Sequence, residues 1–163
     1  MGASYQTCDP GLYPTKGVNP LSGIKETYCA PCPLGFYCIG GDKGRDSKPQ
    51  PCDAGYYGRA VGMSSRETAC MACPEGFSCM EGADFPKRCG PGSYSPAGAS
   101  ECTLCNAGWH CPGSTGDPIQ CAKGHFAPVP GMAYCTPCPV GMYCEFKEGL
   151  NLMEPKLCAE GTY

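Results

Sequence analysis

Cys-Pro-Leu-Gly-Phe-Tyr-Cys, at residues 32–38, returns almost unchanged as Cys-Pro-Val-Gly-Met-Tyr-Cys at residues 138–144. Both stretches open with Cys-x-x-Gly, a pattern that begins at eleven of the 17 cysteines, and nine of these eleven alternate strictly with the remaining eight cysteines. We call the nine first cysteines openers: Cys8, Cys32, Cys52, Cys73, Cys89, Cys105, Cys121, Cys138 and Cys158. The other eight, the closing cysteines, each lie between two openers: Cys29, Cys38, Cys70, Cys79, Cys102, Cys111, Cys135 and Cys144. This strict alternation indicates a tandem-repeat protein.

The distance from an opener to its closing cysteine alternates between long and short. Cys8 to Cys29 is a long interval. Cys32 and Cys38 form a short one with five residues between them, and every other short interval also has five. We take one long and one short interval as the full repeat. The predicted repeats are residues 1–51, 52–88, 89–120 and 121–157, and residues 158–163 are expected to begin a truncated fifth repeat of a longer array.

The composition indicates that burial of aliphatic side chains cannot hold this chain together. The sequence has 24 Gly, 18 Pro and 17 Cys, but only seven Leu, three Ile, four Val and five Phe. So few large apolar residues cannot offset the chain entropy lost on folding, so that disulfides or metals must stabilise it. The net charge of −3 argues against a nucleic-acid partner, and no apolar run is long enough for a membrane span.

The residues after each opener predict short β-hairpins. The Gly of Cys-x-x-Gly favours a turn, and two residues later seven of the nine positions hold Tyr or Phe, the exceptions being Ser78 and His110. Helical patterning is nearly absent, and only Glu145 to Leu157 is compatible with a turn or two of helix. We therefore predict a small disulfide-rich fold, in which tandem cysteine-rich repeats form an elongated rod with short β-hairpins and little helix.

Disulfides and zinc are the two interpretations of the cysteines. The Cys-x-x-Cys spacing, as in Cys29 and Cys32, is also that of zinc sites, and four cysteines per repeat could hold one ion. However, zinc domains usually carry basic residues and often His, and the two His residues of this chain lie in unrelated places. Cysteine-dense modules with little core are typical of oxidising compartments. We therefore predict disulfides, with no metal and no cofactor.

The disulfide connectivity has two alternatives at this stage. Each opener can pair with the next closing cysteine, which leaves Cys158 unpaired in this fragment. That pattern has the bridges Cys8–Cys29, Cys32–Cys38, Cys52–Cys70, Cys73–Cys79, Cys89–Cys102, Cys105–Cys111, Cys121–Cys135 and Cys138–Cys144. In the rival pattern, Cys29 pairs with Cys38, Cys32 with Cys52, and so on, which leaves Cys8 unpaired and ties successive repeats together.

The two quoted heptads, with the unit that runs from Cys89-Gly-Pro-Gly-Ser-Tyr-Ser to Cys102-Thr-Leu-Cys105, resemble the ephrin-receptor-like cysteine-rich repeats. More distantly they are similar to tumour-necrosis-factor-receptor and EGF-type modules. The resemblance covers essentially the whole chain and implies extracellular, elongated tandem modules. It supplies no catalytic residues. Ser78, His110 and the long first loop depart from the pattern.

Candidate catalytic and metal-binding residues are few. His110 beside Cys111 suggests a base and a nucleophile, but His110 aligns with the Tyr of sister units and Cys111 with a closing cysteine, which favours a structural role. His125 follows a turn glycine and is expected to be exposed. Asp42 and Asp46 could offer oxygen atoms to calcium, but the EF-hand spacing is missing and a solvated loop is favoured. We therefore predict no enzymatic activity.

These observations predict a structural, non-catalytic component of an extracellular surface coat or filament, reached by the secretory pathway. Its partners would be copies of itself or other surface-coat proteins. The alternative is a receptor or adhesion ectodomain that binds a protein ligand. One apolar cluster stands out, and it is either an interface patch or, as we favour, a cover for the junction with the fifth repeat: Leu150, Leu152, Met153 and Leu157.

Overall fold

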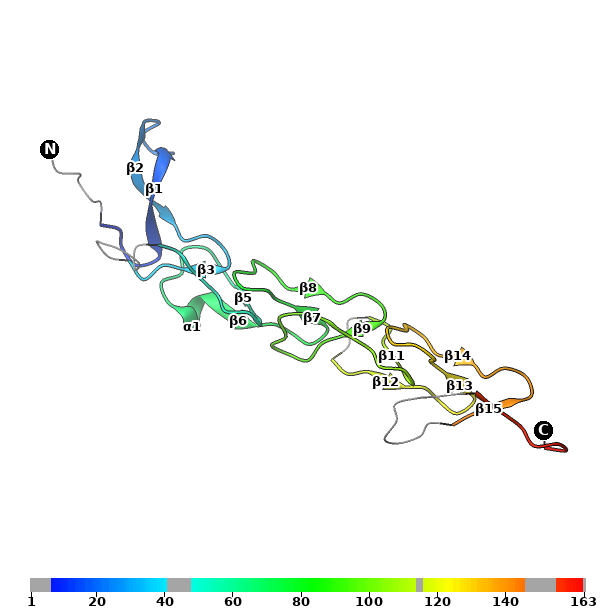
Figure 1. Ribbon diagram of the computed structural model, residues 1–163. Coiled ribbons are helices and arrows are strands. Elements are labelled where there is room, and N and C mark those ends of the chain that lie inside the picture. The colour runs from blue at the N-terminus through cyan, green and yellow to red at the C-terminus, as the bar shows by residue number, and fades with distance from the viewer. Residues whose placement is uncertain (1–6, 41–47, 114–115, 146–154, 163) are drawn as a thin grey trace. The chain divides into compact units, whose positions relative to one another are not determined.

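The computed structural model describes residues 7–40, 48–113, 116–145 and 155–162, and Figure 1 shows a succession of short hairpins. The described residues form eight antiparallel two-stranded sheets. The strand pairs are β1 (Leu12–Val18) with β2 (Lys25–Pro31), β3 (Phe36–Tyr37) with β4 (Gln50–Pro51), β5 (Tyr56–Gly58) with β6 (Cys70–Ala72), β7 (Phe77–Ser78) with β8 (Lys87–Arg88), β9 (Ser93–Tyr94) with β10 (Thr103–Leu104), β11 (Trp109–His110) with β12 (Ile119–Gln120), β13 (His125–Phe126) with β14 (Thr136–Pro137), and β15 (Met142–Cys144) with β16 (Pro155–Leu157). The predicted small disulfide-rich hairpin fold is confirmed.

Each hairpin fills one interval between successive openers. The first strand begins directly after the opener's glycine, and the second ends directly before the next opener. The hairpins belong to two compact units, of which the first comprises Met1–Cys73 with Cys79–Pro86 and the second Pro74–Ser78 with Lys87–Tyr163. The unit boundaries fall within the second predicted repeat, and the division into four repeats stays a prediction.

The structure has the first of the two disulfide patterns, with every opener from Cys8 to Cys138 bonded to the next closing cysteine. In long intervals the closing cysteine lies on or just before the second strand, as Cys70 does on β6. In short intervals it ends or follows the first strand, as Cys144 does on β15. The two cysteines of each Cys-x-x-Cys therefore belong to different bridges. Cys158 has no disulfide partner among the described residues.

The buried apolar residues are almost all half-cystines. Among the described residues, the buried hydrophobic set consists of eleven Cys and three Ala, with no aliphatic or aromatic side chain larger than these. Both sulfurs of the Cys32–Cys38, Cys73–Cys79 and Cys105–Cys111 bridges are within it. The disulfides therefore provide the core as well as the cross-links.

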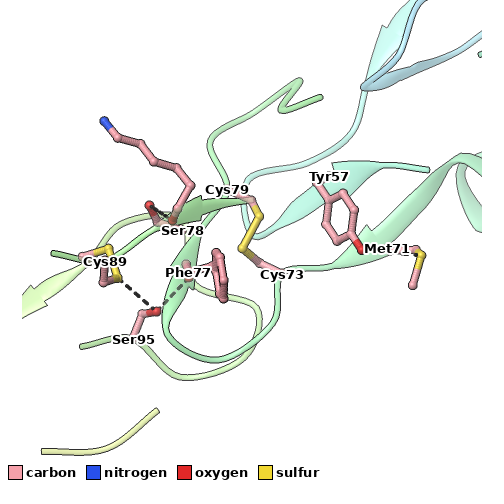
Figure 2. Close-up of a disulfide and its surroundings, with 10 residues drawn as sticks. Tyr57, Met71, Cys73, Phe77, Ser78, Cys79, Cys89 and Ser95 are labelled. Atoms are coloured by element: carbon pink, nitrogen blue, oxygen red, sulfur yellow. Dashed lines mark hydrogen bonds between the residues drawn. A yellow bond between two sulfur atoms is a disulfide. The ribbon is translucent and has the colours of Figure 1, made fainter. Parts of the chain in front are cut away.

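The residue three positions after the opener's glycine is small and buried in every interval from Cys32 to Cys144, whereas the first interval has the half-buried Pro14. In short intervals it is the closing cysteine, and in three long intervals it is a buried Gly58, Ser95 or Ala127. Figure 2 shows Ser95, whose hydroxyl donates to the Phe77 carbonyl at 2.7 Å and lies 3.4 Å from the Cys89 sulfur. At Gly58 a Cβ would collide with the backbone of Gly35, so this position excludes any side chain.

Backbone hydrogen bonds close each hairpin and join it to its neighbour. From Cys32 to Cys158, the N–H of each opener donates to the carbonyl of the preceding opener's glycine, at N···O distances of 2.7–3.0 Å. In the first unit the Gly11 N–H donates to the Cys38 carbonyl, and in the second the Gly92 N–H donates to the Cys111 carbonyl, which in both cases lies in the next hairpin. Because these bonds use main-chain atoms, most side chains can vary without disturbing them.

The helix expectation differs from the structure. Residues 146–154 of the expected helical stretch lie outside the described residues, and Pro155–Leu157 form strand β16. The described residues instead contain one short helix, α1 (Arg66–Ala69). The Arg66 guanidinium lies 2.7 Å from the Asp53 carboxylate and 4.9 Å from the centre of the Tyr56 ring. These tertiary contacts, absent from any local pattern, hold the helix in place.

Gly92 provides a test of how closely the hairpins approach each other. Gly92 and Gly98 both have positive φ, of 84° and 77°, but a Cβ on Gly92 would collide with the Gly131 carbonyl, whereas Gly98 has open space. Gly98→Ala should cost about 1–2 kcal/mol for the left-handed backbone alone. Gly92→Ala should cost about 1–3 kcal/mol more, because two backbones must separate. Denaturation with the disulfides intact measures the difference, and equal losses would contradict the close approach.

Candidate interaction surfaces

The residues considered for catalysis have structural surroundings. The Cys111 sulfur is bonded to Cys105, so it offers no thiolate. The His110 ring is half-buried, with Nδ1 3.1 Å from the Ala133 carbonyl oxygen. His125 is exposed on β13. The arrangement thus does not bring a nucleophile and a base together at His110.

The candidate metal and interface residues lie mainly in parts of the chain that are not described. Asp42, Asp46, Leu150, Leu152 and Met153 all lie outside the described residues. Leu157 is described, and 76% of its surface is exposed. Within the described ranges, no three or more His, Cys, Asp or Glu side chains come together as a metal site.

The residue two positions after each opener's glycine, which is usually Tyr or Phe, is half-buried in most hairpins, as Tyr13, Tyr57 and Tyr94 are. Ser78 and His110, which replace the aromatic residue in two hairpins, are half-buried too. The Tyr57 hydroxyl lies 3.8 Å from the Met71 sulfur across the β5–β6 hairpin, as Figure 2 shows. Tyr57 therefore packs along its own hairpin.

The first candidate surface is the tip of the β1–β2 hairpin. Its strands have seven residues each, whereas all other strands have two or three, and Figure 1 shows them extending beyond β3, β5 and β6 of the same unit. At the end of this hairpin Val18, Leu21 and Ile24 are 54%, 96% and 62% exposed. We call these three residues the apolar tip.

The polar groups of the same loop are used to hold its conformation. The Leu21 N–H donates to the Asn19 side-chain carbonyl at 2.9 Å, and the Gly23 N–H donates to the Asn19 backbone carbonyl at 2.8 Å. The Ser22 hydroxyl and the Asn19 amide both donate to the Glu26 carboxylate, at 2.7 and 2.6 Å. The loop is therefore ordered by its own hydrogen bonds, while its aliphatic side chains point into solvent.

Two of these hydrogen bonds also lower the pKa of Glu26. The bond from Ser22, and to a lesser extent that from Asn19, lowers the pKa of Glu26 below its ordinary value. Because the carboxylate is favoured in the folded loop, its contribution to stability is present above the unfolded-state pKa and is lost as the pH falls through the lowered one. At neutral pH Glu26 is therefore ionised and accepts both of these bonds.

The second candidate surface is an open hollow of about 420 Å³ beside the β11–β12 hairpin in the second unit. Trp109, the only tryptophan of the chain, and Pro118 supply its apolar walls. Asn106 and Asp117, both exposed, supply polar groups. A hollow with an aromatic wall and a few polar groups is the usual form of a binding site for an apolar group.

Comparison with protein-family models and with curated proteins finds no match to this chain. Among the described helices, none is long and apolar enough to cross a membrane. Assignment to a repeat family and to a function therefore rests on the residues and the geometry.

Sequence reasoning missed both surfaces. In the sequence the long first loop stands out as a departure from the repeat, and three aliphatic residues among Asn, Pro, Ser and Gly in a turn are a signal of exposed apolar side chains. The single tryptophan was a signal for the hollow. Neither signal shows which residues share a surface, because that depends on strand pairing.

Ser22→Ala tests how the apolar tip is held. Removal of the hydroxyl should raise the pKa of Glu26 toward its ordinary value, with the bond from Asn19 retaining part of the shift. A pH titration of the carboxyl carbons by NMR measures this change. Glu67 in the same variant is the control, since its pKa is lowered by its own backbone N–H and by Ser65 and should not move. An unchanged Glu26 pKa would contradict the proposed role of Ser22.

Proposed function

We propose that this chain is a structural, non-catalytic component of an extracellular surface coat or filament. The observation that carries the proposal is that most of the buried hydrophobic residues are the same cysteines that form the disulfide bonds. Eleven of the fourteen buried hydrophobic residues are half-cystines, and they repeat along the whole described chain. A protein built in this way gains stability from covalent staples and needs no large globular core.

The repeated backbone bonding supports a mechanical role. Most hairpins are joined to neighbouring hairpins through main-chain groups such as the Gly55 N–H and the Cys79 carbonyl. Arrays in which a module contacts only nearby modules extend in one dimension, and we propose an elongated rod on that ground. Each bridge adds roughly 2–4 kcal/mol against unfolding in the chain-entropy model.

The disulfides also support secretion. Eight bridges in a chain of this length are typical of proteins that mature in an oxidising compartment. We therefore propose an extracellular or cell-surface location, and that the repeats belong with the ephrin-receptor-like modules that they resemble.

A receptor or adhesion ectodomain is the second candidate, because the apolar tip is a surface that could bind a protein ligand. In that role the array would be a spacer that holds the tip away from a cell. The two functions predict different distributions of the protein on the cell surface. Immunogold labelling of intact source cells should follow a continuous coat or filament that survives mild detergent. Scattered labelling that detergent removes would overturn the structural role in favour of the receptor.

The dependence on the cystines can be tested on the purified chain. Alkylation without reduction should modify no more than one cysteine, Cys158, as measured by intact mass. Reduction should then speed trypsin cleavage at exposed sites such as Lys87 and Arg88 by about tenfold or more, because the core is lost with the bridges. A control incubated without reductant should stay intact. Modification of sixteen or more cysteines before reduction would contradict the stapled array.

A further inference from the structure

We propose that the apolar tip of one copy docks into the Trp109 hollow of a second copy, and that this contact joins copies head to tail. The inference rests on the proposed function, since it names the partner that a filament-forming chain would bind. It joins a surface of the first unit to a surface of the second unit on another molecule.

The apolar tip is preorganised for docking. More than half of the surface of each aliphatic side chain is exposed, while Asn19 and Ser22 are both bonded to Glu26 within the loop. Docking would therefore remove apolar surface from water without breaking these hydrogen bonds. A loop that is already ordered also loses little conformational entropy on binding. Leu21, at 96% exposure, has the most surface to bury.

The Trp109 hollow offers what such a tip requires. Its volume of about 420 Å³ accommodates a branched aliphatic side chain, and Trp109 and Pro118 give it apolar walls. Aromatic walls in a recessed site contribute strongly to protein association. The Asn106 side chain can bond to a backbone group of the incoming loop.

The charges around the two surfaces are complementary. Exposed Lys16 and Lys25 flank the apolar tip, and Lys25 directly follows Ile24. The opposite charge within the tip, on Glu26, is engaged by its own loop. The hollow presents the exposed Asp117 carboxylate. Complementary charges of this kind set the register and the rate of association more than its strength.

Because the tip and the hollow are different surfaces, each copy keeps one of each unsatisfied after a first contact. A heterologous contact of this type continues into an open chain or closes into a ring, whereas a contact of the tip with itself stops at a dimer. The proposal therefore gives a structural array a specific means of polymerising.

The test uses the full oxidised chain in sedimentation velocity over a range of concentrations. Leu21→Ser should weaken self-association by about tenfold or more, because it removes the aliphatic side chain with the most surface to bury. Val140→Ser is the matched control, since Val140 is also fully exposed but belongs to neither surface, and it should leave association unchanged. Trp109→Ala should weaken association as Leu21→Ser does, with alkylation used to verify that the bridges have formed.

Charge exchange tests the pairing of the two surfaces without altering a buried residue. Lys25→Glu and Asp117→Lys should each weaken association by about two- to fivefold, as expected for exposed charges. The two changes in one chain should restore it, because each contact again joins opposite charges. Equimolar mixing of the Leu21→Ser and Trp109→Ala variants should give mainly dimers, since the one intact tip meets the one intact hollow.

The outcomes separate this inference from the proposed function. Oligomers that Leu21→Ser leaves unchanged would overturn the tip contact and leave the structural role standing. Loss of association in Leu21→Ser but full association in both Trp109→Ala and Asp117→Lys would indicate a tip-to-tip dimer and overturn the head-to-tail contact. If the chain stays monomeric but its apolar tip binds phosphatidylcholine–phosphatidylserine vesicles, the head-to-tail contact is overturned and the tip is a membrane-binding surface. Failure of the proposed function itself would appear in the cell labelling.

Discussion

The sulfur–sulfur bond between each opener and its closing cysteine is the constraint on which the rest of the structure depends. A chain with so few aliphatic residues cannot fold by burial alone, and the described residues bury half-cystines where other proteins bury Leu or Ile. The bridge thus has two roles, since it limits the unfolded chain and also supplies the buried apolar atoms. This explains why hairpins with strands of only two residues, such as β9 and β10, can persist in water.

This core restricts the residue type at only a few other positions. A small residue is needed beside the cystine, as with Ser95 and Ala127, and glycine is needed where two backbones meet, as with Gly92 near Gly131. Many of the other contacts between hairpins are main-chain hydrogen bonds, which do not depend on the identity of most side chains, and a few use a side chain, as Ser95 does with the Phe77 carbonyl. Surface residues are therefore free to differ from one hairpin to the next. That freedom lets one hairpin carry an apolar tip and another an aromatic hollow on the same repeated framework.

The separation between a disulfide-stabilised framework and variable surface residues connects the fold to the proposed function. The stapled hairpins provide durability, and we propose that recognition between copies uses two hairpins that differ from the others. The β1–β2 hairpin departs by its long strands, and the β11–β12 hairpin by Trp109. A coat or filament needs both properties, since copies must withstand an extracellular environment and still join in a defined register.

By itself the sequence determined the repeat, the hairpin fold and the importance of the cystines, because the Cys-x-x-Gly period and the lack of aliphatic residues are properties of the chain alone. It left two disulfide patterns open, because both are compatible with the same spacing. Tertiary structure decided between them, since only strand pairing brings Cys52 to Cys70 with a Cα–Cα distance of 5.6 Å. It alone also placed α1 against Tyr56, exposed Leu21 at a hairpin end and formed the hollow beside Trp109. The physical reason is that exposure and contact are properties of the packed hairpins, to which residues far apart in the chain contribute.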